Sequence, residues 1–535
     1  KETYAFICLQ KSFINNLFSA SSYHSTDHIL ANLELVDKTD YTPEQLRRLL
    51  FVITVETAID VPWSQLFQHL PDISVLAYSG QIRSISIQMS HRAKRNITHL
   101  VEAAKDAPMV YTDDVENLSP LIATYFNCSN LADPNKYEIK KWIVKCIDAF
   151  MDRSLTPGLH KRIKSDVKII PDMEKPTVLV INEFYFDKHA MYRGYRPRIA
   201  ALKERFHTIG VGVESQFDKL GQKDFHETIV IPDEDKLKLD SIIKKIIKCK
   251  PDIVYYPSVG MTIFAPFLAS RRLAPIQVVS GGHPASTYLS SIDYFHTADF
   301  HGRSDNINNI ITETWLPHKR ENLVRKEIKF NLKETDLNSS VANIAINGVI
   351  QKISSELIET CKKISIAANR KVIFHFFMAH PKQDIEFFAA QSLLRRFLPN
   401  SSLHPFSNYN NYMSILNDCL FALGTFPFGG TNSNVDLIKL IKPKLFVVDE
   451  SDISGLTDYD IWASVGYVSG ECRDNDELIG RAVSWVNDER LLNIELKKMK
   501  DADLMSKILT EENTLEPQLA ELFSQIIEQK VAGHE

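Results

Sequence analysis

The sequence lacks the marks of several classes of protein. It has seven cysteines among 535 residues and no C-x-x-C pair, so we expect reduced thiols and no zinc site. Lysine and arginine number 62 against 67 aspartates and glutamates, and the net charge of −5 excludes the strongly basic surface typical of nucleic-acid-binding proteins. No apolar run approaches the roughly 18–20 residues of a membrane span, and no secretory signal is visible at residues 1–6. We therefore expect a cytoplasmic protein with no membrane span.

The length and composition fit a multidomain globular protein. A chain of this length is too long for one hydrophobic core, and 44% hydrophobic with 24% charged residues is ordinary. Residues 1–165 are expected to form an all-helical N-terminal domain. Residues 40–50 combine a capping residue, Pro43 and Glu44 ahead of leucines, which is typical of a helix start. In residues 137–151, apolar side chains recur every three or four positions.

From residue 176 onward, apolar strands alternate with helices. Strands are expected at 177–181, 209–213, 228–231, 252–256, 275–279, 343–346, 371–377, 419–423 and 445–448. Helices are expected at 198–206, 236–249, 350–367, 385–397, 435–441 and 476–486. This α/β pattern predicts two Rossmann-like, doubly wound parallel sheets, at residues 176–335 and 340–535, the second with C-terminal helices. Ligands in such sheets bind beyond the carboxyl ends of the strands.

Residues 425–436, Thr-Phe-Pro-Phe-Gly-Gly-Thr-Asn-Ser-Asn-Val-Asp, are the most informative segment. They connect an expected strand to an expected helix. Gly429 and Gly430 let the backbone approach a ligand closely, and the amides of the helix's first turn favour an anion. Asn432 and Asp436 are four residues apart and share one helix face. The pattern suits a sugar nucleotide, and the alternative is a polar turn that caps an ordinary helix.

Four ordered blocks resemble a known family. They are Pro-Ser-Val-Gly-Met at 257–261, Arg-Leu-Ala-Pro-Ile-Gln at 272–277, Gly-His-Pro-Ala-Ser-Thr at 282–287 with Ile-Asp-Tyr at 292–294, and the block at 426–432 with Asp436. Together they resemble glycosyltransferase family 41, in particular the bacterial cytosolic N-glycosyltransferases that modify high-molecular-weight adhesins. O-GlcNAc transferases are distant relatives. The resemblance implies a GT-B fold with two domains facing a cleft, a UDP-sugar donor, inversion at the anomeric carbon and no metal or other cofactor.

The resemblance also implies which residues bind the donor. Asn432 and Asp436 align with an asparagine and an aspartate that contact UDP, and Lys352 aligns with a lysine that contacts the diphosphate. His380 stands where the family has a glutamine that shapes sugar selection. Gly429, Gly430 and Thr431 complete the expected donor set. A threonine that precedes the family's lysine is replaced by Val349.

On the acceptor side the sequence departs from the family. The family's loop His-Ser-Ile-Tyr-Arg-Thr-His reads His-Ala-Met-Tyr-Arg-Gly-Tyr at 189–195. His189, Tyr192 and Arg193 match, whereas Tyr195 replaces the second histidine. In the later His-Pro-His-Ser block, the second histidine is replaced by Phe406. We take Tyr192, Arg193 and Phe406 as acceptor-side candidates, and the proton-handling candidates are His189, Tyr195 and His283.

These patterns predict a UDP-hexose-dependent glycosyltransferase, with glucose as the expected sugar. The acceptor is an Asn in Asn-X-Ser/Thr or a sugar already attached to such a protein, for example an adhesin. The alternatives are an enzyme that only elongates protein-linked glucose, and a non-catalytic partner of a glycosyltransferase. Two D-x-D sequences, at 233–235 and 458–460, resemble the metal motif of a different glycosyltransferase fold. Both are expected to be helix caps or solvated loops.

Overall fold

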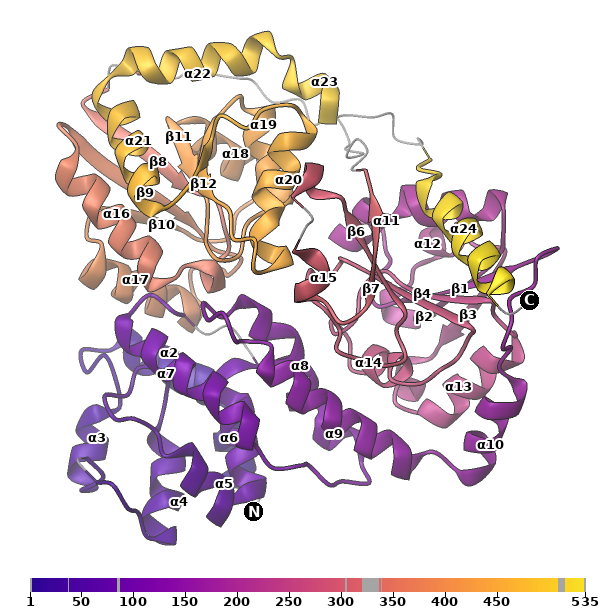
Figure 1. Cartoon of the computed structure of the whole chain (residues 1–535). Coiled ribbons are helices and arrows are strands. Elements are labelled where there is room, and N and C mark those ends of the chain that lie inside the picture. Colours follow the sequence, from indigo (N-terminus) through magenta and orange to yellow (C-terminus); the bar gives the residue numbers. More distant parts are fainter. Residues whose placement is uncertain are drawn as a thin grey trace. The chain divides into compact units, whose positions relative to one another are not determined.

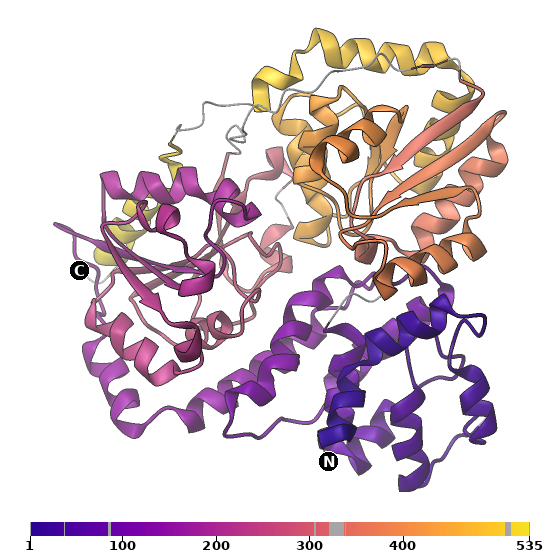
Figure 2. The ribbon, with the colours of Figure 1, turned by 180° about the vertical axis from the view of Figure 1, so that it is seen from behind.

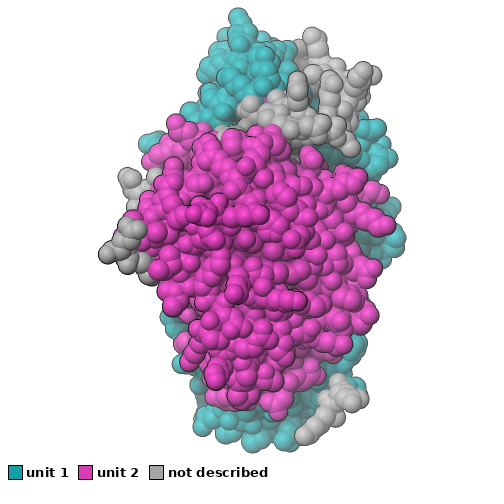
Figure 3. Space-filling model, turned by 90° about the vertical axis from the view of Figure 1, so that its right-hand side faces the viewer, with its two compact units in different colours: residues 1–108, 127–139, 328–507 teal, residues 109–126, 140–327, 508–535 magenta. Residues whose placement is uncertain are grey.

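The computed structural model describes residues 2–36, 38–83, 87–303, 306–319, 336–337, 339–508 and 515–533 (Figures 1 and 2). These residues form two compact units (Figure 3). Unit 1 comprises residues 1–108, 127–139 and 328–507, and unit 2 comprises residues 109–126, 140–327 and 508–535. The expected division into three domains, with its second boundary at residues 335–340, stays a prediction.

The N-terminal region is helical, as expected. Between residues 2 and 166 the described residues form helices and turns, apart from an isolated bridge between Gln88 and Ser354. In unit 1 the helices are α1 (Glu2–Leu9), α2 (Lys11–Ala20), α3 (Asp27–Asn32), α4 (Pro43–Val52), α5 (Trp63–His69), α6 (Pro71–Ile82) and α7 (His91–Ala103). The helices α8 (Ser119–Asn127), α9 (Glu138–Ser154) and α10 (Pro157–Asp166) lie mostly in unit 2.

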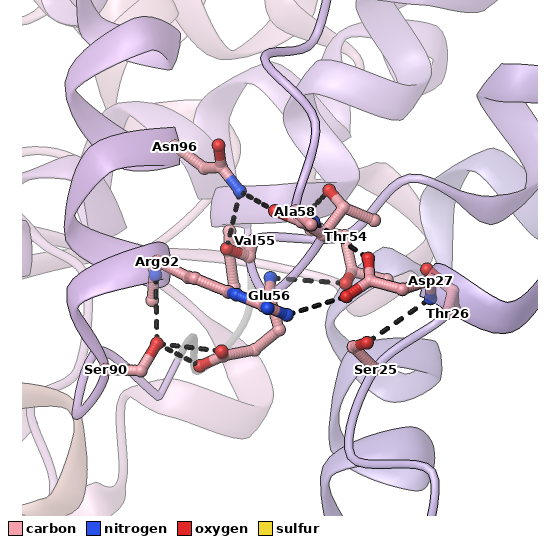
Figure 4. Close-up of polar contacts among 12 residues, drawn as sticks. Ser25, Thr26, Asp27, Thr54, Val55, Glu56, Ala58, Ser90, Arg92 and Asn96 are labelled. Atoms are coloured by element: carbon pink, nitrogen blue, oxygen red, sulfur yellow. Dashed lines mark hydrogen bonds and ion pairs between the residues drawn. The ribbon is translucent and has the colours of Figure 1, made fainter. Parts of the chain in front are cut away.

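A buried polar network fixes the start of α7 (Figure 4). The Ser90 hydroxyl accepts a hydrogen bond from the amide of Ala93 and lies 2.7 Å from both carboxylate oxygens of Glu56. The side-chain amide of Asn96 donates to two main-chain carbonyls in the loop after α4. Glu56 is buried, and burial raises its pKa. Ser90 therefore both caps a helix and provides a partner for a buried acid.

We expect Ser90→Ala to lower the free energy of unfolding by about 2 kcal/mol, because it removes a helix cap and leaves a buried carboxyl unpartnered. Thermal and urea unfolding measure the loss. Thr42→Ala is the matched control, since it removes an exposed cap at α4 and is expected to cost about 1 kcal/mol. Equal losses in the two variants would show that the contact with Glu56 contributes nothing.

The sheet of unit 1 has the strand order β10-β9-β8-β11-β12-β13 and is parallel throughout. Its strands are β8 (Val341–Ile346), β9 (Lys371–Phe377), β10 (Ser401–His404), β11 (Phe421–Leu423), β12 (Lys444–Val447) and β13 (Glu471–Cys472). One face packs its apolar side chains against α16 (Ser355–Ala367), α17 (Ile385–Phe397), α21 (Asn475–Asn487) and α22 (Glu489–Asp501). The opposite side carries α18 (Tyr409–Asn417), α19 (Asn432–Lys439) and α20 (Thr457–Ser464), and the helix α23 (Leu504–Ile508) follows α22 (Figure 1).

The sheet of unit 2 has the order β3-β2-β1-β4-β5-β6-β7 and is also parallel. Its strands are β1 (Thr177–Asn182), β2 (His207–Val213), β3 (Glu227–Ile231), β4 (Ile253–Tyr256), β5 (Ile276–Ser280), β6 (Tyr294–Ala298) and β7 (Thr314–His318). The helices are α11 (Ala190–Ala201), α12 (Lys219–Gln222), α13 (Leu239–Lys248), α14 (Phe264–Ala269), α15 (Ile307–Ile310) and α24 (Gln518–Ala532). Two doubly wound parallel sheets with a helical N-terminal region confirm the expected fold class.

Several elements differ from the sequence-based expectation. The helix expected at 198–206 begins earlier, because His189 caps α11 and Pro197 is accommodated inside that helix. The helix expected at 350–367 is split into a 3-10 turn, Ile350–Lys352, and α16, which Ser354 caps. The C-terminal helix α24, expected with the second sheet, packs in unit 2, where Phe523 contacts Tyr255 and Glu516 pairs with Arg198. The strands β6, β7, β10 and β13 were not expected.

The structure also bears on the expectations about disulfides and membrane-spanning helices. None of the seven cysteines, all of which are described, forms a disulfide, in agreement with the expected reduced thiols. Within the described part of the chain, no helix combines the length and the apolar character that crossing a bilayer requires.

Candidate functional site

In unit 1, Lys352 and the glycine turn meet where the strand order reverses. β8 has β9 on one side and β11 on the other, which makes the gap between the loops after β8 and β11 the topological switch point. Lys352 follows β8, and its Nζ lies 2.6 Å from the carbonyl oxygen of Gly429, which follows β11. The same Nζ lies 3.6 Å from the centre of the Phe428 ring. Two residues of the expected donor set, Lys352 and Gly429, are therefore in contact in the fold.

The environment of Lys352 lowers the pKa of its side chain. Burial lowers the pKa of this ammonium to about 7; the carboxylate of Asp458 opposes the shift, and Lys444 and Lys136 add to it. A diphosphate placed beside Lys352 would favour the charged form and raise this pKa. The lysine is thus suited to gain a proton as an anion binds.

The two glycine amides donate within the protein. The Gly429 amide donates to the carbonyl of Ser454 at 3.0 Å, and the Gly430 amide donates to Oδ1 of Asp458 at 2.8 Å. A Cβ at Gly429 would lie 2.7 Å from Oγ1 of Thr457. Gly429 is therefore needed because the segment at 454–458 approaches its backbone closely, whereas a Cβ on Gly430 would first meet the hydroxyl of Ser433. An anion at this edge would have to meet the start of α19 beyond the turn.

The start of α19 carries the other two aligned donor residues. Among the residues that the structure describes, no side chain caps the helix at Thr431, which suits an exogenous anion. Asn432 is exposed at the first position of α19, and Asp436 is half-buried one turn later. The Tyr409 hydroxyl donates to Oδ1 of Asp436 at 2.6 Å, which orients this carboxylate from α18.

His380 and Phe406 lie side by side beyond the carboxyl ends of β9 and β10. The Phe406 amide donates to the His380 carbonyl at 2.8 Å, and the Phe406 side chain is 67% exposed. Nδ1 of His380 lies 3.3 Å from Oδ2 of Asp384. Nearby, His375 and His404 stack, with 2.9 Å between Nδ1 and Nε2. Burial lowers the pKa of His375 to about 4 and also lowers that of His404, so both rings are neutral at pH 7.

One group of side chains has the composition of a metal site. Ligand atoms of His380, Asp384 and Glu386 lie within 4.8 Å of one another. All three residues are partly exposed and belong to the loop after β9 and the first turn of α17. His380 is one of the expected donor residues, whereas Asp384 and Glu386 were not candidates.

In unit 2, a buried acid occupies the corresponding switch point, between β1 and β4. Glu183 directly follows β1, and its Oε1 accepts hydrogen bonds from the amides of Gly260 and Thr262 and from the Thr262 hydroxyl, at 2.7–3.0 Å. Gly260 has a φ of +118°, a conformation that favours glycine. Burial raises the pKa of Glu183 to about 7. The acid thus holds the loop after β4 in place.

The loop held by Glu183 also fixes the tautomer of His283. Nδ1 of His283 lies 3.1 Å from the carbonyl oxygen of Val259. Because a carbonyl only accepts, Nδ1 carries the proton in the neutral ring, and Nε2 holds a lone pair. The ring is buried and packs against Phe126 and Tyr125. His283 therefore has the tautomer of a general base.

His189 has the opposite tautomer. Its Nδ1 accepts a hydrogen bond from the Met191 amide at 3.2 Å, as the cap of α11, so the ring proton lies on Nε2. Burial and then the charge of Arg193 lower the pKa of His189. In this state His189 can donate a hydrogen bond through Nε2 but cannot accept a proton there. Of the two histidines, His283 is the better candidate for a base.

The remaining acceptor-side candidates lie on α11. Tyr192 is buried against Tyr185, and burial raises its pKa to about 12. Tyr195 is partly buried and packs against the apolar cluster of unit 2 that includes Tyr185 and Tyr192. Arg193 is exposed, and its guanidinium donates to the carbonyl of Lys188 at 2.6 Å.

Two residues at the candidate sites, Asp458 and Glu183, were not predicted from the sequence. Asp458 was expected in a solvated loop or cap, but it is 2% exposed and contacts the glycine turn; Asp460 is buried as well. The other D-x-D sequence, at 233–235, is a partly exposed 3-10 turn, as expected. Glu183 was not considered. A polar residue directly after a buried parallel strand was the available signal for it.

Comparison with known proteins identifies relatives of the chain. It is 29% identical over 344 residues to a protein named UDP-glucose:protein N-beta-glucosyltransferase from Actinobacillus pleuropneumoniae serotype 5b (strain L20), over 62% of this chain and 54% of the relative. The protein of that name from serotype 7 (strain AP76) matches over the same proportions. The chain thus spans about half the length of the curated relatives it matches. No protein-family model matches the chain.

Among solved structures, a variant of the O-GlcNAc transferase of Thermobaculum terrenum matches with a TM-score of 0.58 at 14% identity, over 88% of this chain and 94% of that chain. This likeness supports the GT-B fold of glycosyltransferases. Together with the matches to N-glucosyltransferases, it confirms the resemblance drawn from the motifs. The chain is thus similar in sequence to those N-glucosyltransferases and in fold to that transferase.

The free energy of unfolding should decrease as the pH rises, because of Glu183. The folded-state pKa of about 7 exceeds the unfolded value of about 4.3, so the unfolded state loses this proton first. The native state then loses about 3 kcal/mol between about pH 4.5 and pH 7. Glu183→Gln keeps the oxygen acceptor but cannot ionise, so its stability relative to the unaltered protein should rise by that amount from pH 5 to pH 8. Denaturant unfolding at both pH values tests this, and parallel pH profiles would contradict it.

Proposed function

We propose that the protein transfers a hexose from a UDP-sugar to the side-chain amide of an Asn in an Asn-X-Ser/Thr segment of a polypeptide. The observation that carries the proposal is the contact of Lys352 with the glycine turn, at the switch point of the unit 1 sheet and beside Asn432 and Asp436. The names of the curated relatives support glucose as the sugar and a protein as the acceptor.

The donor half of the proposal assigns the leaving group to unit 1. As the bond between the anomeric carbon and the β-phosphate oxygen breaks, negative charge grows on UDP. Lys352 and the first-turn amides of α19 stabilise that charge more in the transition state than in the ground state. Asp436, held by Tyr409, binds hydroxyl groups of the donor. In this proposal the cationic side chain and the helix start do the work of a divalent cation, so no metal is required.

The acceptor half assigns proton removal to unit 2. The amide nitrogen of the acceptor Asn forms a bond to the anomeric carbon from the side opposite UDP, which inverts the configuration. The proton that the nitrogen loses passes to a base, and His283 is the better of the two histidine candidates for this role, since its Nδ1 donates to Val259. A cytoplasmic location and an adhesin as the acceptor protein are further parts of the proposal, supported by the family resemblance alone.

We expect UDP binding to be coupled to proton uptake through Lys352. Its pKa of about 7 leaves most of the free lysine neutral at pH 8, and the bound diphosphate restores the charge. Calorimetric titration at pH 8 in buffers of different ionisation enthalpy should show uptake of up to about one proton, with affinity falling as pH rises above 7. Lys352→Met should abolish the uptake and weaken UDP binding about 10- to 100-fold.

Lys362→Met is the matched control, since this lysine lies on α16 and pairs with Glu359. It should bind UDP with the normal proton uptake. If the unaltered chain fails to bind millimolar UDP, the protein is a non-catalytic partner instead. If Lys352→Met leaves UDP affinity and turnover unchanged, the lysine has no role at the diphosphate.

A second candidate acceptor is a glucose already linked to protein. The replacement of the family's second histidine by Tyr195, which lies in the core packing of unit 2, favours it, because a sugar hydroxyl needs less activation than an amide nitrogen. Two peptides separate the candidates, one with a bare Asn-X-Thr and one with glucose on that Asn. We expect mass spectrometry to show one added hexose on the bare peptide. A gain on the glucosylated peptide alone would identify an elongating enzyme.

A further inference from the structure

We propose that Asp458 is a positioning residue for the donor: its buried carboxylate, neutralised by Lys444, shapes the glycine turn so that diphosphate binds at the start of α19. The inference rests on the proposed function of unit 1. It gives a role to a residue that the donor motif does not contain and that lies 28 residues after the turn.

The Asp458 carboxylate joins three elements through one oxygen. Its Oδ1 accepts from the Gly430 amide at 2.8 Å, from Nδ2 of Asn434 at 2.8 Å and from Nζ of Lys444 at 2.7 Å. Asn434 lies in the first turn of α19, and Lys444 is the first residue of β12. Asp458 therefore ties the turn, the helix that follows it and the next strand together from α20.

Asn434 closes this arrangement. Its Nδ2 also donates to the Gly430 carbonyl at 2.6 Å, and its Oδ1 accepts from Nζ of Lys444 at 2.8 Å. Asn434 and Lys444 are fully buried, and Asp458 is 2% exposed. A buried ion pair whose hydrogen-bonding groups are largely satisfied is rigid, and loss of one partner leaves an uncompensated buried charge.

The backbone at Gly424 and Gly429 lies close to this carboxylate. A Cβ on Gly424 would lie 2.9 Å from Oδ2 of Asp458, and a Cβ on Gly429 would lie 2.9 Å from Cγ of the same side chain. Both glycines thus allow the close approach of the acid. Gly429, which belongs to the pattern that first pointed to a ligand, is thus required by the close approach of both Thr457 and Asp458.

This contact determines which groups can meet an anion. The Gly430 amide is already bound to a carboxylate, and the Gly429 amide is bound to Ser454. The negative charge of Asp458 would repel a diphosphate unless Lys444 balanced it. The pair therefore presents the anion with a neutral support, while the start of α19 and Lys352 provide the attraction.

The test compares the two ways of disturbing the pair in the full chain, with UDP as the ligand and calorimetry as the readout. Asp458→Ala removes the acceptor for the Gly430 amide and should weaken UDP binding at least about 10-fold. Lys444→Met leaves an unbalanced carboxylate and should weaken it similarly. The double variant Lys444→Met with Asp458→Asn keeps an oxygen for the Gly430 amide without a net charge. It should bind UDP within about fivefold of the unaltered chain.

Asp474→Ala controls for stability. Asp474 caps α21 in the same unit by accepting from the Glu477 amide at 2.8 Å, so its loss should lower the melting temperature without changing UDP affinity. Normal affinity in folded Asp458→Ala would overturn the inference. So would failure of the double variant to recover affinity over Lys444→Met, a comparison that remains available if Asp458→Ala does not fold. Lack of UDP binding by the unaltered chain would instead overturn the proposed function and this inference with it.

Discussion

The reversal of strand order in each parallel sheet is the constraint on which both candidate sites depend. Parallel strands buried on both faces leave little room for polar side chains, so these gather in the loops at the carboxyl edge. At β8 and β11, the reversal separates two loops enough to admit Lys352 beside Gly429. At β1 and β4, the same arrangement places Glu183 against Gly260 and Thr262. One topological rule thus positions a cation in one unit and a buried acid in the other.

Hydrogen bonds to the main chain determine the tautomers of His189 and His283, which residue type alone does not determine. In His189 the ring accepts at Nδ1 because it caps a helix, and in His283 the ring donates at Nδ1 because its partner is a carbonyl. These bonds leave the proton on Nε2 in His189 and on Nδ1 in His283. The Val259 carbonyl that fixes His283 belongs to the loop held by Glu183. The acid therefore supports the candidate base through the backbone, without contacting a substrate.

The sequence allowed the fold class to be predicted, because long apolar strands alternating with amphipathic helices are a local signal. The short strands β6 and β10 were not predicted, since His296 interrupts the apolar character of β6 and Leu403 is the one apolar residue of β10. A helix was expected to start at Arg198, yet α11 starts at Ala190, after a cap that only the fold reveals, and continues through Pro197. For the site, ordered motifs identified Lys352 and the glycine turn. The burial of Asp458, in α20, could not be foreseen, because its partner Lys444 lies 14 residues away in the strand β12.

The charges at the turn explain why a lysine can serve a diphosphate there. Lys352 and Lys444 contribute two positive charges when protonated, and Asp458 contributes one negative charge. Because Lys444 and Asp458 lie 2.7 Å apart and are buried, they act on a ligand mainly as a neutral pair. The remaining charge belongs to Lys352, whose proton is weakly held until an anion arrives. The attraction for the leaving group is therefore concentrated on one side chain, and it strengthens as negative charge develops on that group.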